Sequence, residues 1–585
     1  MTRKREELVN PHLDSESGPR DDRGLLVEEP IWLHDVDRAI YGWVTRPMEP
    51  SVRGGVVLTP PIGRDIHASR RAFRRLALLL AERGFVVIRI DYPGTGDSSC
   101  ALEDAHLEGT WTASVAVAAQ YLERSGVRDV SAVGLRFGAV VAGLAGATTA
   151  NLASLVLWDP CESGRSFLRE QSALEALRRD RFQWDAGGAV ETSEVVFTPA
   201  LAEQLQQLNL SEAPLTPMAK RVLALVRTDR TVPTKLRSRL EHESITWETT
   251  SEQPAMLETE PYSAVMPEQT MKRIVSWLSE PQPEFMDHFN PVPSDESAVV
   301  EQAVNGHAVR ERFLQLGPSG LFAISSEPEG PSRGPWIVML NVSNEAHTGP
   351  SRLWVDLSRR WASAGLRCVR FDLSGIGDSP RGETQSDRPL YDPAWMKDVV
   401  DVARSISTDH PSQVVLVGLC SGAFLAAEAS LTLKARGACL INPPVGTNVL
   451  HGVVALERSS SSTLRTLGAR IKRMGAQHRW VAAGLWQVGR VFMPRPFSED
   501  LLSTIAKNGT TLLVLASVQD LPPYPDIPIL RSIDRRRVVS PRGYQAHIVP
   551  GLDHSMLVSE GRERVVALLN EHILQTYARD SLNTR

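Results

Sequence analysis

The chain has 585 residues, a net charge of −5 and 42% hydrophobic residues, which is typical of a globular protein with about two to four domains. Lys and Arg (64 residues) nearly balance Asp and Glu (69), which argues against a broad nucleic-acid-binding surface. The five cysteines include no C-x-x-C pair, so we expect neither a disulfide framework nor a cysteine zinc site. This cysteine usage suits the reducing cytoplasm, where we expect the protein to reside.

Two segments near the start of the chain bear on targeting and membranes. Residues 1–24 have no apolar run behind their basic residues, so they are predicted to form a disordered tail and not a secretory signal. Residues 137–158 lack charge and are long enough to span a bilayer. Because Gly146, Thr148 and Asn151 interrupt this run, it predicts a buried helix, a turn and a buried strand, and we expect no membrane span.

The chain contains an internal repeat. Residues 84–99 (GFVVIRIDYPGTGDSS) return at residues 365–380 as GLRCVRFDLSGIGDSP, and the identical Asp, Gly and Ser positions share one offset. Further matching segments follow in the same order: SAVGLRFGA (131–139) with VLVGLCSGA (415–423), and LVLWDP (155–160) with ACLINP (438–443). Preserved order and spacing indicate a duplicated domain.

We place the two copies at residues 25–280 and 301–580, joined by a linker rich in proline and acidic residues at 281–300. Each copy alternates apolar strand-like runs with amphipathic segments, which predicts a mostly parallel sheet with helices on both faces. After LINP, about seventy residues of poor strand character precede the strand TLLVLAS, and copy one has a similar insert after LWDP. These inserts are predicted to be helical caps, whose apolar residues either line an acyl pocket or form the cap's own core.

The segment QVVLVGLCSGAFLAAEA predicts a strand, a sharp turn and a helix, with Cys420 at the centre of G-x-C-x-G. This is the context of a nucleophile elbow, in which Gly418 and Gly422 permit the tight turn. The Cys420 side chain would project into a cleft, and the helix N-terminus would favour its thiolate. The alternative is that Cys420 is a small buried apolar residue.

In the segments FDLSGIGDS, IDYPGTGDS and LWDPCESGRSFLRE, the two copies resemble a tandem of α/β-hydrolase domains. In detail they are similar to bacterial hydrolases found beside exosortase and natural-product gene clusters. The fold orders its triad as nucleophile, acid and histidine. Cys420, Asp520 and His554 meet that order, so His554 would take the thiol proton and Asp520 would hold the imidazole tautomer. Asp526 is a weaker candidate for the acid.

An oxyanion hole requires two donors. One is the backbone N–H of Ser421, directly after the nucleophile, and the other comes from the loop after the strand WIVML. By position, Val342 or Ser343 supplies that second donor. This assigns Ser421 to the oxyanion hole through its backbone and not to nucleophilic attack.

Four polar residues near this site are expected to have supporting roles. Asn341 would brace the oxyanion loop, and His347 either lines the cleft or is a solvated loop histidine. Asp378 and Ser379, in the GIGDS turn, are expected to cap the following helix.

Copy one lacks the triad. At its elbow, GLRFG, the central residue is Arg136, which is no nucleophile, and Tyr262 stands opposite His554. Asp229 is a remnant of the acid. We therefore expect copy one to be a pseudo-enzyme domain that is either structural, including dimer-forming, or binds an anion at Arg136, such as a carboxylate or the phosphate of phosphopantetheine.

Cysteine attacks acyl carbons well, and exchange between two thioesters is nearly isoenergetic. Some related hydrolase-fold enzymes with G-x-C-x-G, including polyester synthases and dienelactone hydrolases, use this cysteine. The resemblance implies an acyltransferase or thioesterase in specialised metabolism, acting on a coenzyme A or carrier-protein thioester or on an ester, without a cofactor of its own. The alternatives are a simple ester or lactone hydrolase and a non-catalytic scaffold. No metal or nucleotide motif is present.

Overall fold

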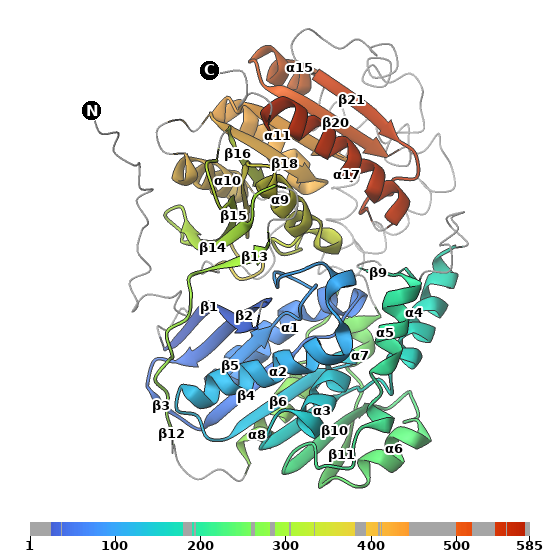
Figure 1. Cartoon of the computed structure of the whole chain (residues 1–585). Coiled ribbons are helices and arrows are strands. Elements are labelled where there is room, and N and C mark those ends of the chain that lie inside the picture. Colours follow the sequence, from blue (N-terminus) through green and yellow to red (C-terminus); the bar gives the residue numbers. More distant parts are fainter. Residues whose placement is uncertain are drawn as a thin grey trace, which may run out of the picture.

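The computed structural model describes residues 25–36, 38–179, 190–191, 195–258, 264–280, 287–302, 306–332, 334–380, 393–407, 410, 412–443, 499–517, 544–556 and 558–578 (Figure 1). Several predictions made from the sequence fall outside this part of the chain. They concern the tail at residues 1–24, the second cap at residues 444–498, and the side chains of Tyr262, Asp520 and Asp526.

The first unit, residues 25–280, is built on an eight-stranded sheet with the order β1-β2-β5-β4-β6-β7-β10-β11. The strands β1, β2 and β5 pair antiparallel, and the remaining pairs are parallel. The strands are β1 (Leu26–Asp35), β2 (Arg38–Pro47), β4 (Gly54–Thr59), β5 (Phe85–Ile90), β6 (Val130–Leu135), β7 (Ser154–Trp158), β10 (Arg221–Arg227) and β11 (Ile245–Thr250).

Helices cover both faces of this sheet, because alternate strand residues are apolar on opposite faces. Helices α2 (Leu107–Arg124) and α3 (Phe137–Thr148) pack in one core, whereas α1 (Arg64–Ala81) and α8 (Glu268–Ser279) pack in the other. The uncharged run at residues 137–158 forms α3, a turn and β7, as predicted. None of the helices in the described ranges has the length and apolar character needed to cross a membrane.

The insert between β7 and β10 contains helices, as expected of a cap. It consists of α4 (Gly164–Arg179), α5 (Pro199–Gln207), the short strands β8 (Val190–Glu191) and β9 (Val196–Phe197), and a 3₁₀ turn, η2 (Leu210–Glu212). Smaller elements of the first unit are β3 (Ser51–Val52), η1 (Leu102–Asp104), α6 (Thr234–Leu240) and α7 (Gln253–Leu257).

The second unit, residues 297–578, has a nine-stranded sheet with the order β13-β14-β15-β17-β16-β18-β19-β20-β21. Apart from the added edge strand β13, the strand order repeats that of the first sheet, which fits a duplicated fold. The strands are β13 (Ser297–Glu301), β14 (Val309–Leu316), β15 (Leu321–Pro328), β16 (Trp336–Met339), β17 (Arg367–Phe371), β18 (Val414–Leu419), β19 (Gly437–Ile441), β20 (Thr511–Ser517) and β21 (Tyr544–Val549).

Helices again separate into two layers around this sheet. Helices α10 (Pro393–Ile406), α11 (Ser421–Leu433) and α15 (Glu499–Lys507) belong to one core. Helices α9 (Leu353–Ser363) and α17 (Ser559–Ile573) belong to the other, and a π-helical turn, η5 (Leu574–Ala578), follows α17. A 3₁₀ turn, η4 (Pro350–Arg352), precedes α9.

A separate apolar cluster joins the two units. It combines residues of β1 and β2 with residues of β13, β14 and β15, and Trp32 stacks on Phe313 with ring centroids 5.1 Å apart. In Figure 1 strand β13 lies between the two sheets, beside β1 and β2. Two strands begin within the predicted linker: β12 (Asp287–His288) pairs with β3, and β13 already begins at Ser297.

Candidate active site

The sharp turn predicted around Cys420 is present between β18 and α11. Cys420 has φ 53° and ψ −114°, a strained conformation for a residue with a side chain. A Cβ atom on Gly418 would lie 2.2 Å from the Gly422 carbonyl oxygen, and one on Gly422 would lie 2.6 Å from the Asn341 carbonyl oxygen. Only glycine fits at both places, because backbone atoms fill the space. Arg136, with φ 54° and ψ −116°, has the same geometry in the first unit.

The turn brings Cys420 to the predicted histidine. The Nε2 atom of His554 lies 3.0 Å from the Cys420 sulfur, and His554 follows the edge strand β21. The Cys420 residue is partly exposed and His554 is exposed, so the pair is open to a substrate. An imidazole at this distance can accept the thiol proton. Asp520 as the orienting acid remains a prediction, because it lies outside the described residues.

Asn442 positions the histidine loop, a role that the sequence did not reveal. Its Nδ2 donates to the carbonyl oxygens of Asp553 (3.0 Å) and His554 (2.9 Å), and its Oδ1 accepts from the Ser517 N–H (2.8 Å). The carboxyl ends of β19 and β20 are thereby tied to the loop after β21. The one feature of the sequence that points to Asn442 is its alignment, in LINP, with the polar Asp159 of LWDP.

Ser421 is buried, and its Oγ accepts a hydrogen bond from the Ser343 N–H at 2.8 Å. This bond joins the loop after β16, which is predicted to supply an oxyanion donor, to the start of α11. The Ser343 amide is therefore engaged by Ser421 in this structure, whereas Val342 is the neighbouring predicted donor. At this elbow, it is the Cys420 sulfur that lies 3.0 Å from His554 Nε2.

Asn341 braces the loop after β16, as predicted. Its Nδ2 donates to the Glu345 carbonyl oxygen (2.8 Å) and to Asp372 Oδ1 (3.0 Å). Its Oδ1 accepts from the Leu373 N–H at 2.8 Å. The loop is thus fixed to the carboxyl end of β17 before it reaches the elbow.

His347 neither lines the cleft nor lies in solvent, so both expectations for it are wrong. It is 1% exposed, with Nδ1 2.8 Å from Asp372 Oδ2 and Nε2 2.8 Å from Asp97 Oδ2. Because carboxylates face both ring nitrogens, both nitrogens donate and the imidazole is a cation. Burial opposes this charge, but Asp372 and Asp97 outweigh it and raise the pKa of His347 to about 10.

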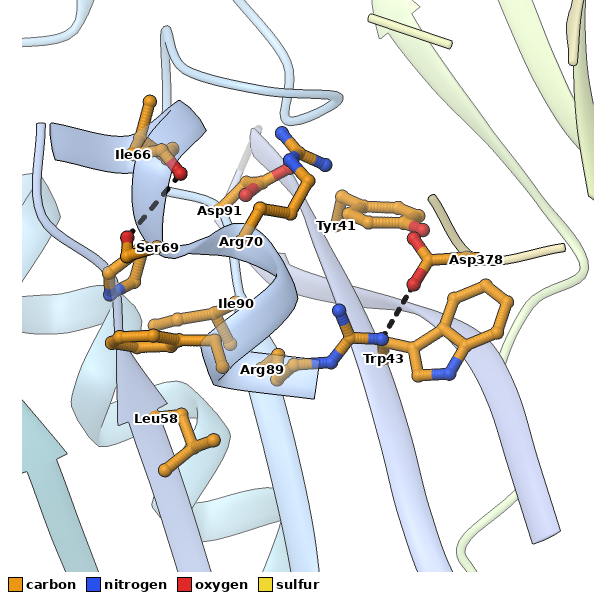
Figure 2. Close-up of a pocket in the computed structure, with 12 residues that line it drawn as sticks. Tyr41, Trp43, Leu58, Ile66, Ser69, Arg70, Arg89, Ile90, Asp91 and Asp378 are labelled. Carbon is orange, nitrogen blue, oxygen red and sulfur yellow. Dashed lines mark hydrogen bonds and ion pairs between the residues drawn. The ribbon is translucent and has the colours of Figure 1, made fainter. Parts of the chain in front are cut away.

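The second GxGDS turn does not cap a helix, contrary to expectation. Ser379 Oγ donates to the Asp372 carbonyl oxygen at 2.6 Å and accepts from the Phe322 N–H at 3.0 Å. Asp378 crosses to the first unit, where it accepts from Arg89 at 2.7 Å (Figure 2). The sequence placed these residues on a turn but could not show that the Asp378 side chain would bind the first unit.

The corresponding aspartate of the first unit makes the reciprocal contact. Asp97 accepts from Arg370 at 2.9 Å, and Arg370 occupies in the repeat the position of Arg89. The two units are therefore joined by two ion pairs, and in each of them the Arg of one unit binds the Asp of the other. Beside the Arg89–Asp378 pair lies a cavity of about 40 Å³ that Tyr41 and other residues line, as Figure 2 shows; Cys420 is not among them.

Arg136 is enclosed by acidic side chains. It is 5% exposed and lies 3.3 Å from Asp65 and 3.5 Å from Asp159, and it also pairs with Glu170. An anionic ligand would have to displace one of these carboxylates, so the geometry favours a structural role. Asp229, which the sequence predicts to be a remnant of the acid, pairs with Arg227 at 2.6 Å. Within the described ranges, no His, Cys, Asp and Glu residues gather as a metal site would require.

Comparison with known proteins finds similarity to one protein family and to several solved structures. Residues 346–568 match the model of the Alpha/beta hydrolase family, whereas no curated protein matches the chain.

Similar solved structures include a proline iminopeptidase of Mycobacterium smegmatis, with 16% identity, coverage of 43% of this chain and 97% of the other, and a TM-score of 0.31. Est1E of Butyrivibrio proteoclasticus, solved with ferulic acid bound, has 15% identity, coverage of 43% and 98%, and a TM-score of 0.32. An esterase of Pyrococcus furiosus has 13% identity, coverage of 46% and 97%, and a TM-score of 0.33. Residues 346–568, within the second unit, are thus similar to the Alpha/beta hydrolase family.

Proposed function

We propose that the protein is an acyl-transfer enzyme that forms an acyl-cysteine intermediate on Cys420. The observation that supports this most is the 3.0 Å contact between the Cys420 sulfur and His554 Nε2 at a strained elbow. A buried structural cysteine would need neither the strain nor the imidazole. Strained backbone conformations of this kind concentrate at functional sites.

In the first half-reaction, the thiol proton passes to His554 Nε2 and the sulfur attacks the acyl carbonyl carbon. The backbone N–H groups of Ser421 and Val342 would stabilise the oxyanion. Collapse of the tetrahedral intermediate breaks the bond to the leaving thiol or alcohol, which takes the proton from His554. An acceptor alcohol, amine, carbon nucleophile or water then repeats the sequence in reverse. Asp520 would hold the imidazole tautomer.

The favoured donor is a thioester on coenzyme A or on a carrier protein. Transfer from one thioester to another is nearly isoenergetic, so the acyl-cysteine is not a deep trap. The resemblance to hydrolases from natural-product gene clusters suggests specialised metabolism as the setting. Coenzyme A or phosphopantetheine would then be part of the substrate and not a resident cofactor.

We further propose that residues 301–580 form the catalytic domain and that residues 25–280 form a pseudo-enzyme domain. Arg136 replaces the nucleophile there, and three carboxylates surround its guanidinium. A buried cation in this setting holds the β4, β6 and α4 segments together, as Asp65 follows β4 and Glu170 lies on α4. Its role would be structural.

The decisive experiment is intact-protein mass spectrometry after incubation with a panel of acyl coenzyme A thioesters and p-nitrophenyl esters. We expect one acyl group on the wild-type protein, located on the Cys420 peptide, and none on Cys420→Ala. His554→Ala should slow acylation by at least about a hundredfold. Cys100→Ala is the matched control, because Cys100 is the other partly exposed cysteine in the described ranges. Acylation that is unchanged in Cys420→Ala would refute the proposal.

Product analysis then separates the two kinds of acyl enzyme. With alcohol and amine acceptors present, a transferase gives esters or amides, whereas an ester or lactone hydrolase gives only the free acid. A non-catalytic scaffold would show no acylation of the wild-type protein with any donor.

A further inference from the structure

We propose that Asp97 of the first unit is a positioning residue for the acyl-enzyme site of the second, because it fixes the oxyanion loop through His347. The inference rests on the function proposed for Cys420. It gives the pseudo-enzyme unit an indirect part in catalysis, through the position of a loop in the second unit.

The contact between Asp97 and His347 crosses the two units and excludes water. The side chains of both residues are 0% exposed, and Asp97 Oδ2 lies 2.8 Å from His347 Nε2. The other oxygen of Asp97 accepts from Arg370 at 2.9 Å. A buried charge pair with additional hydrogen bonds has a defined geometry, and removing one partner leaves the other charge uncompensated.

A second anchor holds the far end of the same loop. Arg352, at the start of α9, donates to the carbonyl oxygens of Gly96 (2.7 Å), Ser98 (2.7 Å) and Cys100 (3.2 Å), all in the turn that contains Asp97. One turn of the first unit therefore binds the segment 341–352 at two points. The contact is independent of the His347 ion pair.

From His347 the loop leads directly to the nucleophile. Four residues earlier, the Ser343 N–H donates to Ser421 Oγ, and Ser421 is adjacent to Cys420. The Asn341 carbonyl oxygen lies against Gly422 on the same turn. A shift of the loop would therefore move the Val342 amide relative to Cys420. Displacement of an oxyanion donor lowers rate without requiring any loss of substrate affinity.

The interface supplies a matched control. Asp378 makes the reciprocal ion pair, with Arg89, and is also buried. Within the described part of the chain its carboxylate bonds to Arg89 and not to the oxyanion loop. Asp378→Ala therefore removes one exchanged pair of the interface, as Asp97→Ala does, but leaves His347 in place.

Two substitutions of Asp97 distinguish the effect of the loop's position from the effect of the buried charge pair. Asp97→Ala removes the contact with His347. Asp97→Asn can keep Arg370 as donor to its Oδ1 and donate from its Nδ2 to the Nε2 of a neutral His347. The loop would then stay near its position without the buried charge pair. Asp97→Asn should therefore retain part of the acylation rate that Asp97→Ala loses.

The test measures two reactions of Cys420 in the full chain. Acylation by an acyl coenzyme A thioester or p-nitrophenyl ester passes through an oxyanion, whereas alkylation by iodoacetamide is a direct displacement that needs only the thiolate. We expect Asp97→Ala to lower the limiting acylation rate at least tenfold with little change in half-saturating donor concentration. Alkylation at the Cys420 peptide should stay within about twofold, and Asp97→Asn should lie between Ala and wild type.

Asp378→Ala should acylate at close to the wild-type rate even if its melting temperature falls as far as that of Asp97→Ala. The proposal is overturned if Asp97→Ala acylates like wild type, if alkylation falls in parallel with acylation, or if Asp378→Ala loses acylation equally. A wild-type protein that is never acylated on Cys420 would refute the proposed function instead. Hydrogen exchange of residues 341–349 tests the loop by itself, with faster exchange expected in Asp97→Ala than in Asp378→Ala.

Discussion

His347 should make the protein lose stability as the pH rises above neutral. Its pKa is about 10 in the folded chain, against 6.5 for an unperturbed histidine. The folded state therefore holds one more proton between these values. The resulting stabilisation is complete below about pH 6.5 and is lost as the pH rises through about 10. At about 1.4 kcal/mol for each pKa unit, it amounts to on the order of 5 kcal/mol.

That energy is similar to the whole stability of a small domain, so it should be measurable by urea unfolding. We would record unfolding at pH 7, 8, 9 and 10 for wild type and His347→Gln. The wild-type free energy of unfolding should fall more steeply than that of the variant, by up to about 1.4 kcal/mol per pH unit. Titration of the Lys, Tyr and Cys residues contributes to the slope of both proteins, so the difference between the slopes reports on His347. Parallel slopes would refute the assignment of a buried imidazolium between Asp97 and Asp372.

Three further predictions concern the elbow, the interface and the first unit. Gly422→Ala should destabilise the elbow and slow acylation, because its Cβ would meet the Asn341 carbonyl oxygen at 2.6 Å; wild-type acylation kinetics would contradict this. Trp32→Ala should cost about 3–5 kcal/mol in urea unfolding, since the ring stacks on Phe313 between the units, and a loss below 1 kcal/mol would count against that packing. Arg136→Leu should cost about 3–5 kcal/mol by leaving buried carboxylates without their cation, with acylation of the folded protein unchanged; wild-type stability would contradict the structural role.

The sequence was sufficient for the features that depend on local pattern. The repeat predicted two sheets of the same construction, and both have the same strand order once β13 is set aside. The G-x-C-x-G segment predicted the turn at Cys420, because glycines there are required by backbone atoms 2.2–2.6 Å from a would-be Cβ. The strand-end position of His554 likewise predicted its approach to Cys420, since carboxyl ends of parallel strands share one edge.

The details of the oxyanion loop were less predictable. Asn341 was expected to brace it and does so, but the Ser343 amide is engaged by the Ser421 hydroxyl. The choice between Val342 and Ser343 depends on a peptide orientation, which a sequence pattern does not specify. The sequence pattern does not single out Asn442, because its amide binds a loop more than a hundred residues further along the chain.

What the tertiary structure alone decided is how the two copies use each other. The repeat shows that Asp97 and Asp378 are equivalent, and so are Arg89 and Arg370, but not that each Asp binds the Arg of the other copy. Neither does it predict that His347, expected in a cleft or in solvent, lies buried against Asp97. The hydrophobic pattern of the sequence predicts each fold, because the formation of strands and helices depends on residues that are close together in the sequence. Which buried charges form ion pairs depends on which surfaces of the two units are in contact. That contact is determined only when the apolar faces of β1, β2 and β13–β15 pack together.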